Sequence, residues 1–170
     1  MGVRLYFDLE TYRPRNEDAF INERIIAIGV IEDRSRYAFW GSQNRGSAEV
    51  RIFSEWELGS EKEAASSFCN YVRELAKEYG FKRFELVGFN ILRFDVPLII
   101  CKAARYDIMP IDIASRLFHN VMVRDLFQQL LLANENRYKG CKLDRLYELL
   151  NELGYKGILK PYGNNKDVAK

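Results

Sequence analysis

Two carboxylates near the start of the chain have the spacing of a cation site. Asp8 and Glu10 follow the apolar run 3–7, whose β-branched and aromatic residues predict a buried strand. Side chains two positions apart on a strand share a face, and these two have no adjacent Lys or Arg in sequence. They would repel each other unless a cation or a proton neutralised them, and carboxylate oxygens suit Mg²⁺ or Mn²⁺. The alternative is that Asp8 only ends the strand and Glu10 is a solvated surface charge.

A second acidic motif lies at 88–95, with the sequence Gly-Phe-Asn-Ile-Leu-Arg-Phe-Asp. It follows a predicted short strand at 84–88, and the residues from Asn90 to Arg93 form a predicted loop. Asp95 then opens an apolar segment that predicts a helix, in which Pro97 is tolerated because it falls in the first turn. The alternative for Asp95 is a helix cap without any role in a site.

Together the two motifs resemble those of the DEDD family of 3′→5′ exonucleases, which are DnaQ-like proteins with a ribonuclease-H-like fold. The resemblance is closest to the exonuclease domain of family B DNA polymerases and its stand-alone relatives. Asp8 and Glu10 match the Asp-x-Glu of the first family motif, with Thr11 as its usual neighbour. Asn90, Phe94 and Asp95 match the second motif, which is Asn, three residues, Phe or Tyr, then Asp.

The resemblance implies a role for each matching residue. Asp8, Glu10 and Asp95 would be catalytic ligands of two Mg²⁺ or Mn²⁺ ions, and Thr11, Asn90 and Phe94 would bind the terminal nucleotides. Asp125 ends another apolar strand and precedes a helix, so it is either a helix cap or a residue that supports the site without binding metal.

The fourth catalytic carboxylate of the family is not evident. The polymerase-like branch uses Tyr, three residues, then Asp, and the last acid here is Asp167. Tyr162 stands five positions before it instead of four, and Gly163 occupies the place of the tyrosine. One hypothesis is that Asp167 is the fourth ligand. The other is that it belongs to an irregular, solvated tail at 160–170.

The order of predicted elements supports the fold that the resemblance implies. The patterns predict strands at 3–7, 24–31, 36–40, 49–53, 84–88 and 120–124, and helices at 60–79, 95–104, 126–133 and 143–153. We expect an α/β protein with a ribonuclease-H-like three-layer fold, in which helices flank a mixed sheet with an N-terminal antiparallel meander. The carboxyl ends of its parallel strands meet at one edge, and Asp8 falls at that edge. The chain is expected to form a single exonuclease-like domain, 1–170.

The predicted function is a metal-dependent 3′→5′ exonuclease that hydrolyses single-stranded nucleic acid by a two-metal mechanism. The alternative is a catalytically incomplete ribonuclease-H-like module that binds nucleic acid or a protein partner. Eight basic and four acidic residues between 137 and 170 would suit a phosphate backbone. A third hypothesis is that a protein partner or a second copy in a dimer completes the site.

Composition agrees with a compact enzyme of this kind. The 170 residues are 48% hydrophobic, enough to bury the core of one α/β domain, and the net charge is only +2. We find no signal peptide and no apolar run near 18 residues, so no membrane association is expected. The expected location is the cytoplasm.

Overall fold

The computed structural model describes residues 2–13, 20, 22–34, 48–152 and 154. The chain forms two compact units, Met1–Asp125 and Leu126–Lys170, and each is described by itself. That the whole chain forms a single domain therefore stays a prediction. The predicted strand at 36–40 and the tail at 160–170 lie outside the described residues.

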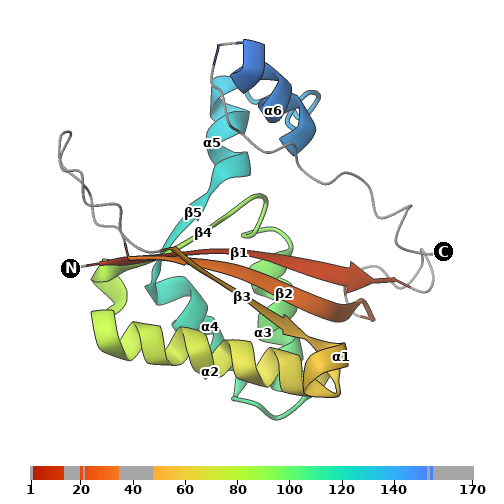
Figure 1. Cartoon of the computed structure of the whole chain (residues 1–170), viewed down its shortest axis with the longest axis vertical. Coiled ribbons are helices and arrows are strands. Elements are labelled where there is room, and N and C mark those ends of the chain that lie inside the picture. The colour runs from red at the N-terminus through yellow and green to blue at the C-terminus, as the bar shows by residue number, and fades with distance from the viewer. Residues whose placement is uncertain (1, 14–19, 21, 35–47, 153, 155–170) are drawn as a thin grey trace. The chain divides into compact units, whose positions relative to one another are not determined.

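The first unit is built on a mixed five-stranded sheet with the order β3-β2-β1-β4-β5 (Figure 1). Its first three strands pair antiparallel, and the other two pair parallel to β1 and to each other. This arrangement confirms the predicted α/β class, the mixed sheet and the N-terminal meander. The strands are β1 (Val3–Tyr12), β2 (Arg24–Asp33), β3 (Ala48–Ser54), β4 (Phe84–Gly88) and β5 (Met122–Asp125).

Strand β1 is longer than the predicted run 3–7. Its alternation continues past Phe7, because Leu9 is buried like the apolar residues before it while Asp8 and Glu10 are exposed. Antiparallel pairing with β2 also continues, with Asp8 opposite Gly29 and Glu10 opposite Ala27. The prediction that Asp8 follows the end of the strand is therefore wrong. Both carboxylates lie within the strand, on the face opposite the apolar core.

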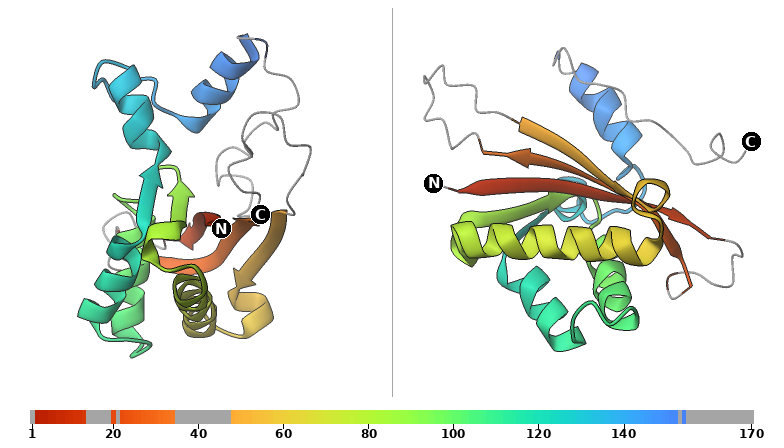
Figure 2. Two further views of the ribbon diagram at one scale, coloured as in Figure 1. Left: turned by 90° about the vertical axis from the view of Figure 1, so that its left-hand side faces the viewer. Right: turned by 60° about the horizontal axis from the view of Figure 1, so that its bottom comes forward.

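Helices cover one face of this sheet, as two further views show (Figure 2). Ser60 accepts a hydrogen bond from the Glu63 backbone N–H at 3.2 Å and so caps α2, which ends before Gly80. A helix at 111–120 was not predicted, although Ala114, Leu117 and Phe118 are buried at helical spacing. The helices of this unit are α1 (Glu55–Leu58), α2 (Glu61–Tyr79), α3 (Asp95–Arg105) and α4 (Ile111–Asn120), with a single turn of 3₁₀ helix at Phe81–Arg83.

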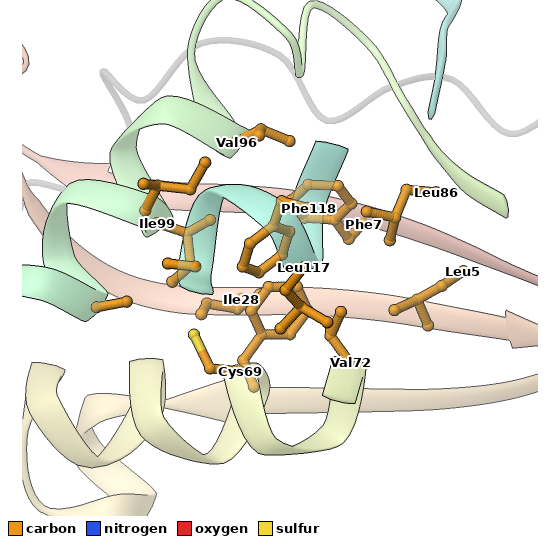
Figure 3. Packing of buried hydrophobic residues seen from close by; sticks show 14 of the residues in the cluster. Leu5, Phe7, Ile28, Cys69, Val72, Leu86, Val96, Ile99, Leu117 and Phe118 are labelled. Carbon is orange, nitrogen blue, oxygen red and sulfur yellow. The ribbon is translucent and has the colours of Figure 1, made fainter. Parts of the chain in front are cut away.

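The core lies between the sheet and these helices (Figure 3). Phe68 of α2 is fully buried at its centre, with ring centroids 5.5 Å from Phe7 of β1 and 6.1 Å from Phe118 of α4. Leu86 of β4 and Ile99 of α3 are also fully buried in the cluster. The apolar face of β1 thus packs into this core, and Asp8 and Glu10 lie on the other face of the strand.

The second unit contains α5 (Leu126–Ala133) and α6 (Leu143–Glu152), close to the two predicted helices. Asn134 orders the segment between them, because its amide nitrogen donates to the carbonyl oxygens of Arg137, at 2.5 Å, and Lys139, at 3.0 Å. The rings of Phe127 and Tyr138 lie 6.0 Å apart. Across the described parts of both units, no helix is long and apolar enough to cross a membrane.

Candidate functional site

The site begins where β1 extends beyond its parallel neighbour. Strand β4 pairs with β1 only from Val3 to Tyr6, whereas the antiparallel partner β2 continues to Tyr12. Asp8 and Glu10 therefore lie past the carboxyl end of the parallel pair, on one exposed face. Ligands in open α/β sheets bind at such an edge.

Asp95 reaches this edge from the start of α3. Phe94 holds the N-cap position and Asp95 is the first helical residue, so Asp95 is not the helix cap. Its Oδ1 accepts a hydrogen bond from the backbone N–H of Leu9 at 3.0 Å, across a sequence separation of 86 residues. Because Leu9 stands between Asp8 and Glu10, this contact places Asp95 beside the part of β1 that carries the other two acids.

The environment of these carboxyl groups opposes their negative charge. Asp95 is only 3% exposed, and burial, together with the nearby charges of Asp8 and Asp125, raises its pKa to about 7 despite the hydrogen bond from Leu9. Asp8 is exposed as a residue, yet the protein around its carboxyl group removes part of its water. This desolvation and the charge of Glu10 raise the pKa of Asp8 as well. A proton or a cation would relieve the repulsion in either case.

Asp125 holds the loop that precedes α3. Its Oδ1 accepts from the Asn90 N–H at 2.8 Å and its Oδ2 from the Leu92 N–H at 3.1 Å. Asn90 has a φ of 64°, a left-handed conformation that Asn tolerates better than most residues. Its side-chain oxygen is buried and has no hydrogen-bond partner within the described part of the protein. Asp125 thus supports the segment that carries Asn90 and Asp95.

Gly88 permits the close approach of β4 to the site, and sequence reasoning did not single it out. A Cβ atom at this position would lie 2.3 Å from the Cγ2 of Ile91 and 2.8 Å from the carbonyl oxygen of Phe7. The strand end therefore fits against the residue just before Asp8 only because it has no side chain. A Gly between an apolar strand and a polar loop was the available signal.

Glu23 is a second residue that sequence reasoning missed. This buried carboxylate accepts hydrogen bonds from the Thr11 hydroxyl at 2.7 Å, the Arg13 guanidinium at 3.0 Å and the Phe20 N–H at 3.2 Å. Burial alone would raise the pKa of Glu23, but these donors outweigh it and lower the pKa. The Phe20 ring lies 6.2 Å from the ring of Phe94, edge to face. Glu23 therefore links Thr11 of β1 to the segment that contains Phe20, whose ring packs against Phe94 beside the site.

The first unit thus brings most of the predicted site residues to one region, and the remaining one, Asp167, lies outside the described residues. Those brought together are Asp8, Glu10, Thr11, Asn90, Phe94, Asp95 and Asp125. Within the described ranges, no three His, Cys, Asp or Glu side chains form a group that could hold a metal ion by themselves. Mg²⁺ commonly binds through one or two carboxylates and completes its shell with water and phosphate oxygens, so the donor set fits that ion.

Comparison with known proteins supports the fold. No protein-family description and no curated protein matches the chain. Among solved structures, a zinc-bound complex of Escherichia coli exonuclease I with single-stranded DNA is 15% identical with a TM-score of 0.55, over 87% of this chain and 35% of that one. A complex of the same enzyme with a dA16 oligonucleotide is 15% identical (TM-score 0.52), and its complex with the SSB C-terminus is 16% identical (0.51), each over 82% of this chain and 31% of that one.

The chain therefore spans about a third of the length of these enzymes and shares the fold of that part. The fold is the ribonuclease-H-like arrangement that the motifs implied. A particular closeness to family B polymerases stays a prediction, because the matching structures are of exonuclease I.

Proposed function

We propose that this protein is a metal-dependent nuclease that removes nucleotides from the 3′ end of single-stranded nucleic acid. One observation carries the proposal: the Leu9 N–H to Asp95 contact joins two acidic motifs that are far apart in sequence. Nothing in local structure requires that meeting. Burial, and secondarily the neighbouring carboxylates, raise the pKa of both Asp8 and Asp95, and a bound cation would favour their charged forms.

Asp8, Glu10 and Asp95 would hold Mg²⁺ or Mn²⁺, and we propose two ions. Bound there, the metal would polarise a phosphodiester group and lower the pKa of an attacking water. Asp8 interacts with both of the other acids: its charge raises the pKa of Asp95, and the charge of Glu10 raises the pKa of Asp8. It is therefore the residue best placed to serve both ions. Asp125 keeps the loop of Asn90 in place while the acids bind metal.

The substrate would be held by the loop that Asp125 orders and by the aromatic pair beside it. The unpaired oxygen of Asn90 can accept a hydrogen bond from the terminal nucleotide. Phe94, packed against Phe20, can stack on an unpaired base. The complexes of exonuclease I with single-stranded DNA make such a strand the first substrate to try. The complex with the SSB C-terminus supports a protein partner as well.

The test is cleavage of a 5′-labelled single-stranded oligonucleotide, as DNA and as RNA, with Mg²⁺ or Mn²⁺. We expect a ladder of single-nucleotide steps from the wild type. Asp8→Asn should reduce the rate by about 10²–10³-fold, because it weakens the hold on the metal ion that would stabilise charge at the reacting phosphate. Asp112→Asn, the same chemical change on the exposed surface of α4, should leave the rate unchanged. A ladder that persists in Asp8→Asn would refute the proposal.

A second candidate is the catalytically incomplete module, which the lack of a three-ligand group among the described residues favours. It predicts binding of single-stranded nucleic acid that weakens with salt, and no cleavage with any added metal ion.

Asp167→Asn tests whether Asp167 is the fourth ligand. If Asp167 is that ligand, this variant loses the ladder as Asp8→Asn does, and if the tail is solvated the variant cleaves like the wild type.

A further inference from the structure

A buried polar cluster lies in the first unit, among residues that the proposed site does not include. Glu61, at the start of α2, is 8% exposed and receives three donors. Its Oε1 accepts from the Ile25 N–H at 2.8 Å and from the Lys102 ammonium at 2.6 Å. Its Oε2 accepts from the Tyr106 hydroxyl. Lys102 is only 2% exposed, so this ion pair is removed from water at both ends. We name these four residues the Glu61 cluster.

The cluster fixes the helix that carries Asp95. Lys102 lies on α3 seven residues after Asp95, which is about two turns, or about 10 Å, along the same side of the helix. Tyr106 follows the last residue of that helix. Helix α3 is therefore tied at its start to β1 through Asp95 and along its length to α2 through Glu61. With two ties, the helix can neither slide nor rotate freely.

The same carboxylate also fixes the strand opposite Glu10. The pairing of β1 with β2 shifts register between Glu10 and Thr11, since Glu10 faces Ala27 whereas Thr11 faces Ile25. The extra residue is Ile26 of β2, and its neighbour Ile25 donates its N–H to Glu61. An irregularity of this kind bends a strand and changes the direction of the neighbouring side chains. Glu61 therefore fixes β2 at the irregularity that lies opposite Glu10.

We infer that the Glu61 cluster positions the metal-binding carboxylates, because it ties the helix of Asp95 and the strand register beside Glu10 to one buried group. This inference rests on the proposed function. A buried ion pair contributes little net stability compared with apolar side chains of similar size. Its directional contacts, made to two elements of the site at once, instead define geometry. Glu61, Lys102 and Tyr106 are thus positioning residues for the site, which they do not contact themselves.

The test compares metal affinity with stability in a variant that keeps the volume of the cluster but removes both charges, Glu61→Gln/Lys102→Met. Mn²⁺ is titrated into the metal-free full chain by calorimetry, well below the unfolding temperature measured in EDTA. We expect the variant to remain folded and its Mn²⁺ affinity to fall about 10–100-fold, the range found when groups that orient metal ligands are lost. Asp112→Asn/Arg116→Met removes an exposed ion pair from α4 and should bind Mn²⁺ like the wild type.

Tyr106→Phe is the milder companion variant, because it deletes one hydroxyl and leaves the ion pair intact. We expect a smaller loss of Mn²⁺ affinity, and this variant decides the matter if the double variant does not fold. Wild-type affinity in a folded cluster variant would overturn the inference. Asp8→Asn separates the two proposals. If it binds Mn²⁺ like the wild type, the proposed metal site is wrong. If it loses Mn²⁺ while the cluster variants do not, only the positioning role fails.

Discussion

Replacing Asp95 by Asn should stabilise the metal-free protein at neutral and alkaline pH. The asparagine has nearly the volume of aspartate and keeps a side-chain oxygen that can accept the Leu9 N–H. What it removes is a carboxylate that is 3% exposed and faces the charges of Asp8 and Asp125. The substitution therefore tests whether burial and the neighbouring charges oppose the ionisation of Asp95, separately from any catalysis.

The magnitude follows from the pKa of Asp95, which is about 7 in the folded protein against 3.8 for an unperturbed aspartate. Between these values the folded state holds a proton that the unfolded state has released, so stability falls as pH rises. The slope is about 1.4 kcal/mol per pH unit, and the loss is complete above the folded-state pKa. From pH 5 to pH 8, Asp95 should cost the wild type about 3 kcal/mol, and Asp95→Asn should avoid this cost.

The assay is urea unfolding in EDTA, followed by circular dichroism at pH 5 and pH 8, for the wild type, Asp95→Asn and the surface control Asp112→Asn. We expect the wild type and the control to lose about 3 kcal/mol more than Asp95→Asn over this range, and Asp95→Asn to be the most stable at pH 8. Mn²⁺ at pH 8 should restore stability to the wild type by binding the folded state. Equal pH dependence in the wild type and Asp95→Asn would refute the reasoning.

Three further outcomes follow from the packing around the site. Gly88→Ala should destabilise the protein by about 2–4 kcal/mol in thermal unfolding, because the added Cβ has no room beside the Phe7 carbonyl. Gly29→Ala should have little effect, because no atom lies within 4 Å of a Cβ at that position. Equal effects of the two substitutions would contradict the close approach of β4 to Phe7. Asp125→Ala should cost about 1–3 kcal/mol and speed amide hydrogen exchange at Asn90 and Leu92, and unchanged exchange there would argue against its role in the loop. The hydrogen bonds from Thr11, Arg13 and Phe20 lower the pKa of Glu23, so its contribution to stability is present above about pH 4.5 and is lost as pH falls. Glu23→Gln should therefore reduce the dependence of the unfolding free energy on pH in the acid range. An unchanged pH dependence would count against the Thr11 and Arg13 contacts.

Short sequence patterns were enough to predict several of the elements that position the site. The alternation around Asp8 placed it on one face with Glu10, because the two-residue period of a strand depends only on neighbouring residues. The apolar run after Asp95 likewise predicted α3 from its first residue. The same locality explains the failures. The end of β1 could not be read from the run 3–7, since its last residues are held in the sheet by pairing with β2. Helix α4 was overlooked although its period was present in the sequence.

The sequence by itself determined which residues could bind a cation and on which side of their own element each lies. Only the tertiary structure decided that Asp95 meets β1 between the other two acids, that Asp125 holds the loop of Asn90, and that Glu61 ties α3 to the strand register beside Glu10. The physical reason is that a hydrogen bond between distant segments depends on how strands and helices pack, which no short window of sequence encodes. The high pKa of Asp95 has the same origin, because burial and neighbouring charges exist only once the chain has folded.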